Sequence, residues 1–255
     1  MRTLLSRILS PHRSAQGYVY VPEVEKGLMR NAKIGSTIRN PDRQAPWIVV
    51  DQSLESVVAA KWPGRLWKVE IIEAAPEQPN SSAKYTRAVA VRVLGEESTS
   101  QLFGRQGVAV SKVIGKARVL ELNDVQLLAK ATNCRAREAY SRAWNNWLAQ
   151  LDPTSPHCGE DLSGTLAISG KDTRSPIGVG FSVLCSVLAE RARDLVGDAA
   201  FVVDDEGEQS FAPDWASALD ALLGAAMAYG APELMSPADR DSLSSAWMHA
   251  FGELK

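Results

Sequence analysis

The sequence predicts an α+β fold, with a mixed α/β N-terminal domain followed by a helical C-terminal domain. Two observations lead to this expectation. Residues 1–130 alternate between β-rich runs and short helical patterns, whereas residues 131–255 carry apolar side chains mainly at helical spacing. The two parts also differ in charge: residues 1–128 hold 18 basic and 12 acidic side chains, and residues 129–255 hold 10 and 18. This contrast suggests two domains with different surfaces.

The first elements alternate between strand and helix. Residues 17–21 are a β-rich run that ends at a proline, and residues 23–31 carry a short helical pattern. Residues 46–51 are apolar and β-branched, as in a buried strand. A helix is predicted over residues 54–61, where Asp51 or Ser53 caps its first turn and Trp62-Pro63 ends it.

Two longer strands follow. The first covers residues 65–72 and places Trp67, Val69 and Ile71 on one face. The second covers residues 85–94, and the polar loop between the two strands indicates antiparallel neighbours. Helices over residues 107–120 and 123–132 complete this part.

The second part of the chain is predicted to be helical with one small hairpin. Apolar side chains at helical spacing, and prolines or capping residues at the starts, predict helices over residues 136–151, 176–197, 213–229 and 237–251. Residues 200–211 are expected to form a hairpin that turns near Gly207, and residues 165–168 a short strand.

Composition places the protein among ordinary globular proteins. It has 255 residues, of which 45% are hydrophobic and 23% charged, which excludes disordered, collagen-like and coiled-coil classes. Its three cysteines, Cys134, Cys158 and Cys185, are too few and too scattered for a disulfide framework, which fits a reducing compartment. Residues 1–10 lack a signal-peptide pattern, and the apolar stretch 221–231 is too short for a bilayer. We therefore expect a soluble cytoplasmic protein without a membrane partner.

Residues 17–95 resemble the ADP-ribosyltransferase-like fold in their layout. Residues 18–31 follow its pattern of a strand and a helix that ends near a glycine. Residues 47–71 follow its pattern of a strand, a short capped helix, a glycine turn and a further strand. The resemblance implies NAD as cofactor and a site in the cleft between the first two strands.

The resemblance also implies particular site residues. Tyr18 and Tyr20 stand where the family holds NAD with a histidine or arginine, and Trp47 and Ser53 lie on or after the second strand. These four are the candidate cofactor-binding residues. Glu97 is the candidate for the late-strand carboxylate that stabilises a ribosyl cation, and Tyr20 is the second candidate catalytic residue. Glu97 does not lie in the paired-glutamate motif of the family.

Other patterns that carry chemistry are incomplete. The three cysteines and three histidines lack the spacing of a zinc site, so no metal is predicted. The Gly178-Val-Gly180 segment lacks the strand and third glycine of a dinucleotide fingerprint. The acidic residues 204–208 lack the ligand spacing of a calcium loop and are expected at a hairpin tip.

Three classes of function are therefore weighed. The first is a non-catalytic protein-binding or immunity-type module that needs no cofactor and has another protein as its partner. The alternative is an NAD-dependent ADP-ribosyltransferase-like enzyme with a divergent site. The third is nucleic-acid binding through scattered basic residues near the N-terminus, namely Arg2, Arg7, Arg13, Lys33, Arg39 and Arg43.

Overall fold

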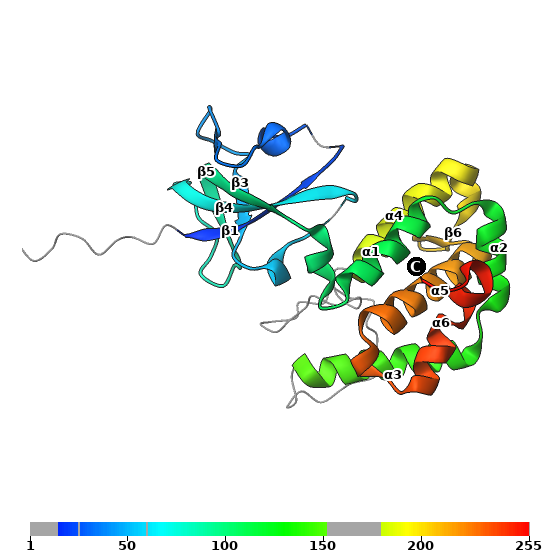
Figure 1. Ribbon diagram of the computed structural model, residues 1–255. Helices are drawn as coiled ribbons and strands as arrows, with labels where there is room; N and C mark the ends of the chain where they lie inside the picture. Colours follow the sequence, from blue (N-terminus) through cyan, green and yellow to red (C-terminus); the bar gives the residue numbers. More distant parts are fainter. Residues whose placement is uncertain (1–14, 25, 60, 152–179, 255) are drawn as a thin grey trace, which may run out of the picture. The chain divides into compact units, whose positions relative to one another are not determined.

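The computed structural model describes residues 15–24, 26–59, 61–151 and 180–254 (Figure 1). The chain forms two compact units, which we call the barrel unit and the helical unit. The barrel unit holds the chain up to Val57 together with Arg65–Glu97, and the helical unit holds Val58–Gly64 together with the chain from Ser98 onward. Helices and strands are both present, so the predicted α+β class is confirmed.

Five strands form the sheet of the barrel unit. They are β1 (Gln16–Pro22), β2 (Thr37–Arg39), β3 (Ile48–Asp51), β4 (Gly64–Ala74) and β5 (Tyr85–Glu97). Their order is β2-β5-β3-β1-β4, and β5 also pairs with β4, so the sheet closes into a small barrel. The pairs β1–β3, β3–β5, β2–β5 and β4–β5 are all antiparallel.

Alternate side chains of these strands point into the barrel and form its core. Buried members include Val19, Ile48, Val50, Trp67, Val69, Ala88, Val91 and Val93. The predicted common face of Trp67, Val69 and Ile71 is confirmed, because Ile71 packs against the same cluster. The predicted antiparallel pairing of the two long strands is confirmed as well.

Two predicted helices of the first part are wrong. Among the described residues of 23–31 there is only η1 (Leu28–Asn31), a 3₁₀ turn preceded by Gly27 in extended conformation. Val24 is 76% exposed, so the apolar spacing of this segment does not mark a face that packs on the core. In the described part of 54–61 the only helical element is η2 (Leu54–Ser56), after which Val57 is extended.

The sequence around η2 explains why the helix stops after one turn. The backbone N–H of Ser53 donates to the hydroxyl of Ser56 at 3.2 Å, and that hydroxyl donates to the Ser53 carbonyl at 2.8 Å. A 3₁₀ turn places residues three apart above one another, so Leu54 and Val57 both become buried without a longer helix.

The helical unit confirms most of the expected elements. It comprises η3 (Thr99–Phe103), α1 (Gly107–Arg118), α2 (Leu122–Ala131), α3 (Cys134–Leu151), α4 (Phe181–Val196), η5 (Gly197–Ala200), β6 (Phe201–Val203), β7 (Gln209–Phe211), α5 (Pro213–Gly230), η6 (Pro232–Leu234) and α6 (Pro237–Phe251). The β6–β7 hairpin lies where it was predicted, and α5 and α6 each begin with proline. The predicted strand at 165–168, the predicted helix start at 176 and Cys158 lie outside the described residues.

Helices α1 and α2 belong to the helical unit. They were predicted as the last elements of a domain ending at residue 130, but contacts with α4, α5 and α6 group them with the later helices. Their buried side chains supply the reason: Val113, Ile114 and Leu128 are fully enclosed, as is Leu222 of α5. Within the described part of the chain, no helix combines the length and apolar character needed to cross a membrane.

Candidate functional site

The helical unit contains a pocket of about 220 Å³, which we call the α3–α5–α6 pocket. Its apolar lining consists of Ala131, Ala136, Ala221, Leu223, Leu243 and Ala246. Its polar lining consists of Thr132, Arg137, Tyr140, Ser141, Asp220, Ser242 and Ser245. A concave, mainly apolar site with a few polar groups is the usual form of a binding pocket.

Small side chains create the space for this pocket. Ala136 of α3, Ala221 of α5 and Ala246 of α6 line it from three helices. Helices α5 and α6 also approach closely, because a side chain at Gly224 would lie 2.9 Å from the carbonyl oxygen of Leu243. The close packing of α5 on α6 therefore holds Leu243 in place at one wall of the pocket. The short alanine side chains on the other walls leave the pocket volume empty.

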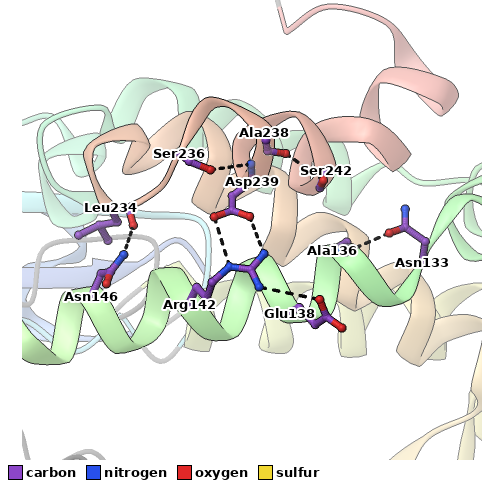
Figure 2. Close-up of polar contacts among 10 residues, drawn as sticks. All are labelled: Asn133, Ala136, Glu138, Arg142, Asn146, Leu234, Ser236, Ala238, Asp239 and Ser242. Atoms are coloured by element: carbon purple, nitrogen blue, oxygen red, sulfur yellow. Dashed lines mark hydrogen bonds and ion pairs between the residues drawn. The ribbon is translucent and has the colours of Figure 1, made fainter.

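Polar contacts hold α3 beside α6 next to the pocket (Figure 2). Arg142 of α3 binds Asp239 of α6 through two hydrogen bonds, from Nη2 to Oδ1 at 2.6 Å and from Nε to Oδ2 at 3.3 Å. The Asn146 side-chain amide donates to the Leu234 carbonyl oxygen at 2.7 Å. The guanidinium of Arg142 holds the pKa of Asp239 below its usual value, so this carboxylate stays charged.

The start of α6 explains why Asp239 points toward α3. The hydroxyl of Ser236 caps the helix and accepts a hydrogen bond from the Asp239 backbone N–H at 3.2 Å. A carboxylate in the first turn also interacts favourably with the helix dipole. These local interactions fix the first turn of α6, from which the Asp239 side chain reaches Arg142.

An ion pair lies among the polar residues of the pocket. The Nε of Arg137 is 3.3 Å from Oδ2 of Asp220, and the two side chains are 68% and 44% exposed. This exposure places them at the mouth of the pocket, where they remain accessible to water. Together they join α3 to α5 across the opening.

Tyr140 is the polar group of the pocket with the strongest electrostatic perturbation. Burial raises the pKa of its phenol far above the ordinary value, and the thiolate that Cys185 forms at high pH and the Asp220 carboxylate act in the same direction. The phenol therefore stays neutral and can act as a hydrogen-bond donor. Among the described residues we find no hydrogen bond from its hydroxyl group.

Two serine hydroxyls of the described pocket lining are engaged with backbone carbonyls of their own helix. The hydroxyl of Ser242 donates to the Ala238 carbonyl at 2.9 Å, and that of Ser245 donates to the Ser242 carbonyl at 2.8 Å. No histidine of the described residues lines the pocket, and these hydroxyls have no imidazole base among those residues. Burial raises the pKa of the nearby Cys185 thiol to about 11, which keeps it protonated. The arrangement suits recognition of a ligand.

The barrel unit holds the residues that the family resemblance singled out. Tyr18 of β1 pairs with Asp51 of β3, and Tyr20 lies two residues further along β1. Ser53 is the N-cap residue that precedes η2, two residues after Asp51, whereas Trp47 precedes β3 at its other end. β1 and β3 are direct neighbours in the sheet, so no open cleft separates these strands.

Glu97 is the last residue of β5 and lies opposite Leu66 of β4. It lies at the opposite end of β5 from Tyr85, which pairs with Asp51. None of the predicted site residues lines the α3–α5–α6 pocket. The assignment of Tyr18, Tyr20, Trp47 and Ser53 to NAD binding, and of Tyr20 and Glu97 to catalysis, stays a prediction.

Two features of the structure were not found from the sequence. One is the pocket, whose lining comes from distant segments. The other is Asp51, which the sequence suggested only as a helix cap; burial raises the pKa of this carboxyl to about 7. The alternation of β3 carried a signal, because Ile48 and Val50 face the core and Asp51 must face the other way.

Comparisons with protein-family models, with curated proteins and with solved structures gave no match to this chain. Among the described residues, no group of three or more histidine, cysteine, aspartate or glutamate side chains is arranged to hold a metal ion. The functional argument therefore starts from the geometry of the α3–α5–α6 pocket.

Proposed function

We propose that the protein is a non-catalytic protein-binding module whose helical unit takes up an apolar side chain of a protein partner. The observation that carries this proposal is the α3–α5–α6 pocket, with alanine and leucine walls and an ion pair at its mouth. Binding surfaces commonly combine a small apolar centre with a polar rim in this way.

The size of the pocket fits one leucine or phenylalanine side chain. Its volume is about 220 Å³. In another protein, an engineered apolar cavity of about 150 Å³ takes up benzene, which is the ring of phenylalanine. Ala136, Ala221 and Leu243 present methyl groups to such a side chain, while the phenol of Tyr140 can donate to a backbone carbonyl beside it.

The free energy available in the pocket favours a protein over a free small molecule. Burying one apolar side chain contributes about 1.5–3 kcal/mol. A dissociation constant of 1 mM already requires about 4.1 kcal/mol. The pocket therefore anchors a partner that gains the rest of its affinity from contacts around the mouth, where Arg137 and Asp220 are exposed.

A titration with model side chains tests this function. The probes are N-acetyl-phenylalanine amide and N-acetyl-leucine amide, with N-acetyl-glutamine amide as a polar control. We expect the apolar probes to shift backbone NMR signals of residues around Ala136, Ala221 and Ala246 with dissociation constants of about 5–100 mM, and the control to leave them unchanged. Shifts that are scattered over the protein, or absent for both apolar probes, would count against the proposal.

A matched pair of variants separates filling the pocket from a general effect of a larger side chain. Ala136→Leu places a side chain in the pocket, whereas Ala149→Leu enlarges a half-buried residue of the same helix that does not line it. We expect Ala136→Leu to abolish the shifts and Ala149→Leu to retain them. Equal binding by both variants would exclude the pocket as the binding site.

A further inference from the structure

A row of three side chains crosses the outer face of the barrel. Tyr18 of β1 pairs with Asp51 of β3, and Asp51 pairs with Tyr85 of β5. Residues paired directly across strands have Cβ atoms about 4.5–5.5 Å apart and side chains on the same face. Asp51 therefore stands between two tyrosines, on the face opposite to the buried Val50.

The carboxylate of Asp51 lacks a partner within the described part of the protein. It is half-buried, and we find neither a hydrogen bond nor an ion pair to its side chain there. Two basic residues lie nearby in β5 and just before it: Arg87, which pairs with Val49, and Lys84, which precedes Tyr85 in sequence. Neither forms an ion pair with Asp51 in the described structure. Burial alone raises the pKa of Asp51.

Four arginines of the barrel unit are paired with glutamates. Arg39 and Arg43 both bind Glu73. Arg65 binds Glu96 at 2.7 Å, and Arg92 lies 3.3 Å from Glu70. The barrel thus supplies partners to these glutamates, whereas the half-buried Asp51 carboxylate has none among the described residues.

We infer that Tyr18, Asp51 and Tyr85 form a binding site for an alkylammonium group. The faces of aromatic rings attract cations, and two rings beside a carboxylate provide both cation–π contacts and a counter-charge. A bound ammonium group would replace the solvation that Asp51 has lost in the folded protein. The site lies in the barrel unit and is independent of the α3–α5–α6 pocket proposed above.

Titration of the full-length protein tests this inference. The probes are tetramethylammonium chloride, n-butylammonium chloride and N-acetyl-lysine amide, and sodium chloride at the same ionic strength is the control. We expect the ammonium probes to shift the NMR signals of residues around Asp51 and to lower the pKa of its carboxyl, because a cation stabilises the charged form. Preference for N-acetyl-lysine amide would indicate a protein partner, and preference for tetramethylammonium a quaternary ammonium ligand.

Variants decide whether the named residues make the site. Asp51→Asn and Tyr85→Leu are each expected to weaken binding by about tenfold or more, whereas Tyr85→Phe keeps the ring and is expected to retain it. Ala136→Leu should leave binding unchanged, which separates this site from the pocket. The inference is overturned if no ammonium probe moves the pKa of Asp51 in the wild-type protein, a measurement that does not depend on the folding of a variant.

Discussion

Replacing Gly224 by alanine tests how tightly α5 and α6 pack beside the pocket. A Cβ atom at this position would lie 2.9 Å from the carbonyl oxygen of Leu243 and 3.4 Å from its Cδ2. Because the nearer atom belongs to the backbone, it cannot rotate away, and α6 has to shift. Leu243 also lines the pocket, so the same shift would change the pocket's shape.

Two opposing effects set the magnitude of this change. Replacing glycine by alanine inside a helix stabilises the helix by about 0.5–1 kcal/mol. Overpacking of a filled interior costs about 1–3 kcal/mol. The close approach to a backbone atom places the cost in the upper part of that range, so we expect a net loss of about 1–2 kcal/mol in the free energy of unfolding.

Gly115→Ala is the matched control. Gly115 lies inside α1, is exposed, and a Cβ atom there would have no neighbour within 4 Å. Only the gain in helix propensity remains, so this variant should be stabilised by about 0.5–1 kcal/mol.

Urea denaturation and thermal unfolding, followed by circular dichroism, measure both variants. For a unit of this size about 1 kcal/mol corresponds to about 2–4 °C in Tm, so the two variants should move in opposite directions by measurable amounts. Stabilisation of Gly224→Ala to the same extent as Gly115→Ala would refute the packing argument.

Further predictions concern the barrel and the helical core. Gly17→Ala should lower the free energy of unfolding of the barrel by about 1–3 kcal/mol in urea denaturation, because its Cβ atom would overlap the backbone oxygen of Asp51. Gly95→Ala is the control and should not destabilise the barrel, because a Cβ atom at Gly95 would have no neighbour within 4 Å. Equal effects of the two variants would contradict this reasoning. The folded protein keeps the Asp51 proton up to about pH 7, while the ordinary pKa is 3.8. The free energy of unfolding should therefore fall as pH rises from about 4 to about 7, and Asp51→Asn should remove that part of the slope in denaturation measured at several pH values. Leu188→Ala should lower the free energy of unfolding by about 2–5 kcal/mol in the same assay, because Leu188 is fully buried. A smaller loss would show that the core around Leu188 is loosely packed.

Elements with a strong local pattern could be predicted from the sequence. The alternation over residues 85–94 identifies β5, and the prolines at 213 and 237 mark the first residues of α5 and α6. In both cases the determining interactions lie within a few neighbouring residues. The helices predicted over 23–31 and 54–61 were wrong because only part of each apolar pattern packs on the core. Val24 and Val58 are exposed, and one turn of 3₁₀ helix is enough to bury Met29 in the first segment and Leu54 in the second.

Features that depend on distant residues could not be predicted. The barrel closes because β5 pairs with β3 and with the three-residue strand β2 as well as with β4. The polar loop between β4 and β5 indicated their pairing, but no local pattern specifies the pairing of β5 with β2 and β3. The candidate pocket depends on alanines from three helices that are up to 110 residues apart in sequence, from Ala136 to Ala246. The row through Asp51 likewise exists only through the strand register.

Contacts between a bound probe and the pocket test the proposed function most directly. Intermolecular nuclear Overhauser effects can be measured between the ring protons of N-acetyl-phenylalanine amide and the methyl groups of Ala136, Ala221 and Ala246. We predict effects to all three methyl groups in the wild-type protein, and none in Ala136→Leu. Effects to methyl groups elsewhere in the protein, with none to these three, would contradict the assignment of the pocket as the binding site.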